Sequence, residues 1–269
     1  IMYKYLNNLL NTKFYDNVNR FISRKFFKIF KIFFVETELS KLPENNHPLD
    51  INYENELNRF IKYNDNNMVP YTSLPNILNK VNIYSPDQSE IKFYDFGGNN
   101  LELYAYLNKN LKKKLFYYYH DQKQFNKIIE KIIDDKNLKN IKVDNELDKT
   151  IKNIDIVYFG SVIQYLQNYK DVLSHFGKGR AKYLIISQTP FFFNEQIRND
   201  LIMKQINLHP IMNYLFAINF YEFINFMNKE NFILLEKSTN RVVKFINFKN
   251  FSKKFKKIDL YDLIFKYEN

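Results

Sequence analysis

A carboxylate and a pair of glycines stand together at the end of a strongly apolar run. The run IKFYDF covers residues 91–96, and Asp95 is followed closely by Gly97 and Gly98. Glycines permit a tight turn and let the backbone come close to a ligand, while a carboxylate accepts hydrogen bonds from a cationic or amine-bearing ligand. Residues 97–102 do not spell the G-x-G-x-x-G pattern of dinucleotide sites, and the sequence has no G-x-x-x-x-G-K-S/T phosphate loop. The sequence therefore predicts a ligand site of another kind here.

Polar residues also follow the next three predicted strands. Asp121 comes after the second strand, one strand–helix–strand unit beyond the glycines, where an acid is placed to bind ribose hydroxyls. Asp144 follows the third strand, in a position suited to an adenine-type edge, and Gly160 and Ser161 end the fourth. Each polar residue has a structural alternative, with Asp121 and Ser161 as helix caps and Asp144 as a turn residue. Polar groups at four successive strand ends favour a ligand site.

The elements that must position these residues alternate between strand and helix from residue 91 onward. Strands are predicted at 91–96, 115–120, 140–143, 154–160, 182–187, 232–238 and 259–267. Helices are predicted at 100–108, 122–134, 146–152, 169–176 and 221–229, with two earlier ones at 52–63 and 74–81. Residues 188–219 are predicted to be a long irregular segment and residues 242–248 an inserted strand. This alternation is typical of βαβ crossovers, so we expect an α/β fold with a mainly parallel sheet.

The N-terminal part of the chain differs from the rest. We expect residues 1–85 to form a helical extension and residues 86–269 to form the main domain. Residues 1–35 have helical periodicity, and Phe alternates with basic residues along 20–34. That stretch is either a helix whose Phe stripe packs on the main domain or one that contacts a membrane surface or a partner.

The composition narrows the classes of function. Lys and Arg total 40 against 29 Asp and Glu, which gives a net charge of +11, yet only six of the basic residues are Arg. Base readout and phosphate clamping favour Arg, and a coding bias toward Lys, Asn, Ile, Phe and Tyr would produce much of this charge. We therefore expect no nucleic-acid partner. The absence of cysteine excludes disulfides, thiolate metal sites and cysteine nucleophiles, and four widely spaced His residues predict no metal site.

Hydropathy bears on location. No run of about 18 to 20 uncharged apolar residues is present, so no membrane span is predicted. The first residues show no signal-peptide pattern, because Lys4 and several Asn interrupt any apolar stretch. We expect a cytoplasmic protein, with residues 20–34 offering a peripheral contact with the inner face of the membrane. The sequence does not predict the oligomeric state.

Several segments, taken in order, resemble a known family. They are DFGG (95–98), GSVIQYL (160–166), QTPF (188–191), KQI (204–206) and YDLIFK (261–266). Together they resemble a family of class I S-adenosylmethionine-dependent methyltransferases encoded in bacterial surface-polysaccharide and lipopolysaccharide gene regions. The resemblance covers about residues 90–267 and implies a Rossmann-like domain, whose mainly parallel sheet has seven strands and helices on both faces.

The resemblance implies S-adenosylmethionine as the cofactor and assigns residues to it. The implied contacts are Asp95, Gly97, Gly98 and Asn99 at the methionine end, Asp121 and Gln122 at the ribose, Asp144 at the adenine, and Gly160 and Ser161 on the other side. The chain departs from the family pattern at Asn99 and Asn100, where further glycines are usual, and at Asp121, where Glu is usual. Asn tolerates a positive φ better than most residues, so the turn can still form.

The acceptor side is predicted from the segments after the fourth and fifth strands. Residues 188–214 are too long for an ordinary connection, and such segments are often functional. Gln164 and Arg198 are candidate substrate-binding residues, with Arg198 suited to a phosphate or carboxylate. The candidate catalytic residues are His209, Asp200 and Tyr165. His209 is the best base by residue type, because an unperturbed imidazole titrates near neutral pH.

Three functions remain open at this point. The first is methyl transfer to a sugar or another glycan precursor in surface-polysaccharide biosynthesis. The second is a non-catalytic binding or scaffold protein that keeps the methyltransferase fold. The third is a basic protein that binds a membrane surface or a nucleic acid through its charge and the 20–34 segment. Affinity for the cofactor separates the first from the second, unless the scaffold still binds the cofactor. A steep loss of RNA or liposome binding with salt favours the third.

Overall fold

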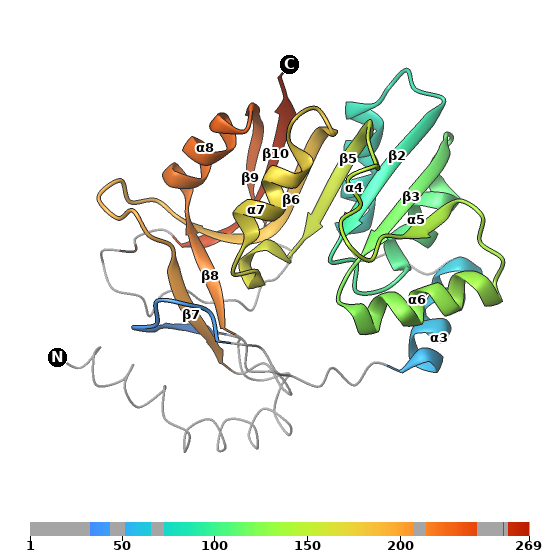
Figure 1. Ribbon diagram of the computed structural model, residues 1–269, viewed down its shortest axis with the longest axis horizontal. Helices are drawn as coiled ribbons and strands as arrows, with labels where there is room; N and C mark the ends of the chain where they lie inside the picture. Colours follow the sequence, from blue (N-terminus) through green and yellow to red (C-terminus); the bar gives the residue numbers. More distant parts are fainter. Residues whose placement is uncertain are drawn as a thin grey trace.

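The computed structural model describes residues 33–43, 52–65, 73–206, 214–240, 255 and 258–268. Figure 1 shows a twisted sheet with helices on both sides and a smaller group of strands beside it. The strands are β1 (Phe33–Glu36), β2 (Glu90–Phe96), β3 (Lys114–His120), β4 (Ile141–Val143), β5 (Ile154–Gly160), β6 (Ala181–Phe192), β7 (Leu201–Ile206), β8 (Tyr214–Asn219), β9 (Phe232–Thr239) and β10 (Asp259–Tyr267). The helices are α3 (Tyr53–Asp65), α4 (Ser73–Tyr84), α5 (Glu102–Asn110), α6 (Lys123–Asp135), the 3₁₀ turn η1 (Ile163–Tyr165), α7 (Tyr169–Phe176) and α8 (Phe220–Lys229).

The described strands form one ten-stranded sheet rather than the seven-stranded sheet predicted. Seven of them follow the order β4-β3-β2-β5-β6-β10-β9, and β8 also pairs with β6 and is followed by β7 and β1. The first five are parallel to one another, and β10 runs antiparallel between β6 and β9. Helices α3 to α6 cover one face, and α7 and α8 cover the other. The predicted α/β fold, with a mainly parallel sheet between two helical layers, is confirmed.

The parallel strands are apolar because both of their faces are buried. In β2, Tyr94 and Phe96 belong to the core under α7 and α8, while Ile91 and Phe93 belong to the core under α3 to α6. Successive side chains of a strand point to opposite faces. Asp95 therefore lies on the α3–α6 face, as Phe93 does.

The two helices before β2 contribute to the main core. Phe60 of α3 and Val81 of α4 are buried with residues of β2, β3 and α5, and Phe60 stacks on Tyr104 with ring centroids 6.4 Å apart. The boundary predicted at residue 85 stays a prediction, although α3 and α4 share a core with the domain that follows.

The membrane-contact segment predicted at residues 20–34 falls largely outside the described residues. Its last two residues begin β1, a strand that pairs antiparallel with β7, so the helix predicted for 1–35 is wrong at Phe33–Val35. Among the described helices, none combines the length and hydrophobicity needed to cross a bilayer.

Two further predictions are wrong. Residues 146–152 form no helix, because Leu147 has a positive φ of 54° and the Asp144 carboxylate accepts the backbone N–H groups of Glu146 and Asp148, which closes a turn. Residues 188–219 are not irregular throughout: β6 continues to Phe192, and β7 pairs antiparallel with β8. The inserted strand predicted at 242–248 lies outside the described residues.

Candidate functional site

The strand order reverses at the boundary between β2 and β5. From β2 the chain moves to β3 and β4 on one side, and then returns to β5 and β6 on the other. In open α/β sheets, ligands bind outside the carboxyl ends of the strands at such a point. The residues after β2, β3 and β5 are therefore the candidate site.

A tight turn follows β2 at this point. Gly97 has a φ of 75° and Asn99 a φ of 58°, and the N–H of Gly97 donates to the carbonyl of His120 at 2.8 Å. A Cβ atom on Gly98 would lie 2.5 Å from the ring of Tyr119. Asn99 occupies the left-handed region, which Asn tolerates through local hydrogen bonding of its short side chain. The predicted turn therefore forms even though Asn99 stands where the family usually has glycine.

Asp121 joins this turn to the end of β3. Its Oδ2 accepts the N–H of Asn99 at 2.7 Å, and its Oδ1 accepts the N–H of Gln122 at 2.7 Å. Burial raises the pKa of the Asp121 carboxyl, and these two backbone donors oppose the rise. Each carboxylate oxygen can accept more than one hydrogen bond, so capacity remains for a ligand hydroxyl.

Asp95 lies beneath the turn. Its side chain is 2% exposed and accepts a hydrogen bond from the Tyr117 hydroxyl, and its Oδ2 lies 2.7 Å from where a Cβ of Gly98 would be. Burial raises the pKa of Asp95 to about 7, and the nearby Asp121 charge adds to the rise. In the structure this carboxylate is bonded inside the fold, and its predicted contact with a ligand stays a prediction.

Asp144 is also buried. It is 4% exposed, and its carboxylate accepts the Tyr94 hydroxyl at 2.6 Å and the N–H of Asp148 at 3.0 Å. These bonds occupy the carboxylate inside the fold. The residue closes the turn after β4, and its predicted contact with an adenine edge stays a prediction.

The residues after β5 form a second polar group. Ser161 has a φ of 58°, and its Oγ accepts a hydrogen bond from Gln164 Nε2 at 2.9 Å. The Oε1 of Gln164 accepts a weaker bond from the Thr189 hydroxyl at 3.3 Å. Gln164 is 2% exposed, so this carboxamide fastens η1 to β6. Gly160 allows the Tyr158 ring to come close, since a Cβ would lie 2.6 Å from it.

Asp262 of β10 completes this group and was not singled out from the sequence. Its Oδ1 accepts the Ser187 hydroxyl at 2.6 Å and the N–H of Gln188 at 2.9 Å, and Asn240 Nδ2 donates to both of its oxygens. Gln188 has a positive φ of 52°. The carboxylate thus stabilises a kink in β6. The signal in the sequence was an acid inside the apolar strand YDLIF.

Of the predicted catalytic residues, Tyr165 follows Gln164 in η1, whereas Asp200 lies apart from the glycine turn. Asp200 lines a cavity of about 620 Å³ beside the start of α7 and accepts the N–H of Asn219 and the Tyr169 hydroxyl, both at 2.8 Å. Burial raises the pKa of Asp200. Burial also raises the pKa of Tyr165 to about 12, which keeps its hydroxyl protonated at neutral pH. His209 lies outside the described residues.

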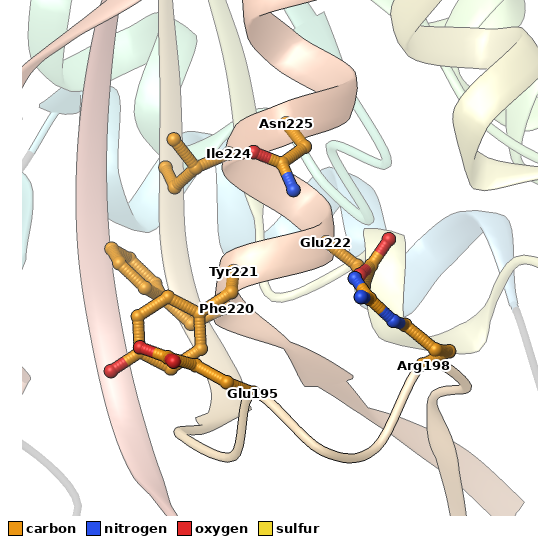
Figure 2. A pocket seen from close by; sticks show the side chains of 7 residues that line it. All are labelled: Glu195, Arg198, Phe220, Tyr221, Glu222, Ile224 and Asn225. Atoms are coloured by element: carbon orange, nitrogen blue, oxygen red, sulfur yellow. The ribbon is translucent and has the colours of Figure 1, made fainter.

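Arg198 lines a separate cavity of about 400 Å³ at the start of α8. Figure 2 shows Arg198 and Glu222 on one side of the first turn of α8, and the rings of Phe220 and Tyr221 on the other. Arg198 forms an ion pair with Glu222. Within the described ranges, no group of three or more His, Asp or Glu side chains could hold a metal ion.

Solved structures share the arrangement of the sheet. One is an S-adenosylmethionine-dependent methyltransferase from Clostridium acetobutylicum ATCC 824, with a TM-score of 0.50 and 10% sequence identity over 81% of this chain and 100% of that one. The fold is that of the S-adenosylmethionine-dependent methyltransferases. Another is the YcgJ protein from Bacillus subtilis, with a TM-score of 0.49 and 9% identity over 74% of this chain and 100% of that one. No protein-family model matches the sequence, and no curated protein does.

The methyltransferase fold brings only part of the predicted site together. Asp95, Asn99 and Asp121 meet with both glycines and Gln122 around one turn. Ser161 and Gln164 form the neighbouring group, and the two groups touch because Val162 packs against Gly97. Asp200 and Arg198 line two other cavities.

Proposed function

We propose that this protein transfers a methyl group from S-adenosylmethionine to a small-molecule acceptor. The observation that carries the proposal is the junction between Asp121 and the Gly97–Asn99 turn at the point where the strand order reverses. The fold shared with a methyltransferase at 10% identity supports the same reaction class without identifying the acceptor.

The residues at this junction fit a nucleoside cofactor. Asp121 keeps hydrogen-bonding capacity for ribose hydroxyls, and Gln122 next to it is exposed. The Tyr119 hydroxyl is buried close to Asp121. Burial and the nearby Asp121 charge both raise the pKa of Tyr119, so it stays a protonated donor beside that carboxylate.

S-adenosylmethionine, when bound, supplies a methyl group carried on a positively charged sulfur. The chain must align the acceptor with that methyl group and keep the two close. Gly97 and Gly98 give the backbone its close approach, and Asp121 orients the ribose. Ser161 and Gln164, held by Thr189, would form the wall on the acceptor side.

We further propose a sugar or another glycan precursor as the acceptor and surface-polysaccharide biosynthesis as the setting, on the strength of the DFGG, VIQYL and TPF segments. A hydroxyl acceptor needs a base. Burial raises the pKa of Asp200, which makes its carboxylate a stronger base. Asp200 lines a cavity separate from the glycine turn, so its part as the base stays a prediction, as does that of His209.

The test is a calorimetric titration of the purified chain with S-adenosylhomocysteine. We expect micromolar binding that weakens at least about tenfold in Asp121→Asn, because the carboxylate both holds the turn and faces the ribose. Asp87→Asn is the matched control, since Asp87 is exposed in the loop before β2. Absence of binding by the unaltered chain, or equal binding by both variants, would contradict the proposal.

A further inference from the structure

A second cleft lies near the carboxyl end of β6. This strand continues past its last pair with β5, Gly160 with Ser187, as far as Phe192. The loop after β6 then meets the first turns of α8, and the two border the cavity of about 400 Å³ that Figure 2 shows. Cavities of about 300 to 1,000 Å³ are typical of small-ligand sites. The lining residues all come from the segments 195–198 and 220–225, so this cleft is separate from the glycine turn.

One buried side chain holds both walls of the cleft in place. Asn219 is fully buried, and its Oδ1 accepts the backbone N–H groups of Tyr221 and Glu222 at 3.0 and 3.2 Å, which caps α8. Its Nδ2 donates to the carbonyl oxygens of Asn194, at 2.9 Å, and Ile197. The loop is therefore fastened to the helix before any ligand arrives, and a site that is already ordered loses less entropy on binding.

Tyr221 supplies the apolar wall of the cleft. The residue is 38% exposed. Two rings hold it edge to face, since the ring centroid of Phe220 lies 5.9 Å away and that of Phe193 lies 6.1 Å away. The face of an aromatic ring carries partial negative charge, whereas C–H groups carry partial positive charge. The apolar side of a sugar ring, which presents several C–H groups, therefore packs well against such a residue.

The polar wall offers hydrogen-bond donors and acceptors together. Arg198 is 75% exposed and pairs with Glu222, and its five N–H donors leave capacity for a ligand. Glu195 contributes an exposed carboxylate, and Asn225 contributes an exposed carboxamide. A hydroxyl group is both a donor and an acceptor, so this set of side chains suits adjacent hydroxyls of one ligand.

The charges around the cleft balance. The carboxylates of Glu195 and Glu222 are matched by Arg198 and by Lys237, whose ammonium lies 4.8 Å from the centroid of the Phe220 ring. A phosphate or another anion would meet both carboxylates, and a cationic ligand would meet both bases. A neutral ligand avoids either repulsion. The cleft differs in this respect from the chain as a whole, whose net charge is +11.

We infer that this cleft is a binding site for a neutral sugar ring, with Tyr221 as the stacking residue and Glu195 and Arg198 as hydrogen-bond partners of its hydroxyls. The inference goes beyond the proposed methyl transfer, since the site needs neither the cofactor nor the glycine turn. The polar side chains that line it are largely exposed, so a single ring binds weakly, and we expect a Kd on the order of 1 mM.

The experiment is saturation-transfer difference NMR at neutral pH. The probes are the methyl glycosides of glucose, galactose and N-acetylglucosamine, each with its 6-phosphate as the charged counterpart. We expect at least one neutral glycoside to bind, with the strongest saturation at protons on the side of the ring that packs on Tyr221. Its 6-phosphate should bind at least about threefold more weakly, because the two carboxylates repel the added charge.

Substitutions at exposed positions test the two walls. Tyr221→Ala should weaken glycoside binding at least about tenfold, whereas Tyr221→Phe, which keeps the ring, should stay within about twofold of the unaltered chain. Leu235→Ala is the matched control with unchanged affinity, because Leu235 is an apolar residue of β9 outside the cleft and is 41% exposed. Glu195→Gln should weaken binding about threefold, since a neutral hydrogen bond replaces a charge-assisted one.

The outcomes are separable from those of the proposed function, which the titration of the unaltered chain with S-adenosylhomocysteine tests. The inference is overturned if no neutral glycoside binds, if the 6-phosphates bind more tightly, or if neither Tyr221→Ala nor Glu195→Gln weakens binding. Those results leave the proposed function standing. Glycoside binding by a chain that does not bind S-adenosylhomocysteine would keep the inference and contradict the proposed function.

Discussion

The glycine-turn region and the β6–β10 region both hold polar side chains at the carboxyl edge of the sheet, but they are assembled differently. In the glycine-turn region the joining hydrogen bonds connect residues 22 positions apart, as between Asn99 and Asp121 and between Asp95 and Tyr117. In the β6–β10 region, Ser187 and Asp262 are 75 positions apart. One βαβ unit therefore builds the first region, whereas the second needs a strand from the end of the chain.

The two regions also differ in the entropy lost when their segments come together. Bringing distant segments together costs more loop-closure entropy than closing one βαβ unit. Asp262 offsets part of that cost by pairing three donors at once. We therefore expect the β6–β10 region to depend on single side chains for stability, and the glycine-turn region to depend on them for binding.

The largest effect is expected from Asp262→Ala. The change leaves the buried Ser187 hydroxyl, the Gln188 N–H and the Asn240 amide without their acceptor, which should cost about 5 kcal/mol of the free energy of unfolding. Urea denaturation measures it, with Asp259→Ala in the same strand as the control, since Asp259 bonds only its neighbour Leu260 among the described contacts. Equal losses for the two variants would contradict the role given to Asp262.

The next effect is a pH dependence that comes from Asp95. Its pKa is about 7 in the folded chain, against 3.8 for the ordinary group. The folded state therefore holds this proton more strongly, so the contribution of Asp95 to stability is fully present below about pH 4 and is lost as pH rises through 7. The loss attributable to this group is at most about 4 kcal/mol.

Asp95→Asn should remove that part of the slope, because the amide stays neutral. The free energy of unfolding of the variant, measured by urea denaturation, should gain on the unaltered chain between pH 5 and pH 8. Asp87→Asn, an exposed site in the loop before β2, supplies the control. Curves that run parallel at all pH values for Asp95→Asn and the unaltered chain would refute this reading.

A smaller difference in stability is expected between alanine substitutions at two glycines, one in a crowded turn and one in an open turn. Gly97 and Gly179 both have a φ of 75°, but a Cβ on Gly97 would lie 2.5 Å from Val162, whereas the nearest atom to a Cβ on Gly179 is 3.8 Å away. Gly97→Ala should thus cost about 2 kcal/mol more than Gly179→Ala, because overpacking adds to the shared backbone strain. Thermal denaturation of the pair tests this, and equal costs would mean that the turn can open.

Most of the sheet could be predicted from the sequence because its parallel strands are short apolar runs between turn residues. One local pattern, an apolar run followed by glycine or a polar residue, predicts the strands β2, β3 and β5. The same pattern marks Gly97, Gly98 and Asp121 at the strand ends. The strands β7 and β8 could not be predicted in that way, because they also pair with β1 and β6 elsewhere in the chain, and strand preference depends on such neighbours. The pattern also gives no sign of burial, so it could not show that Asp144 is buried and closes the turn after β4.

The most direct test of the proposed cofactor site is to find which backbone amides a bound cofactor protects from hydrogen exchange. Amide hydrogen exchange followed by mass spectrometry, with and without saturating S-adenosylhomocysteine, resolves this segment by segment. The account predicts slower exchange at residues 97–101 and 119–123, and unchanged exchange in β7 and β8. Protection confined to β7 and β8, or no protection at all, would contradict a cofactor site at the glycine turn.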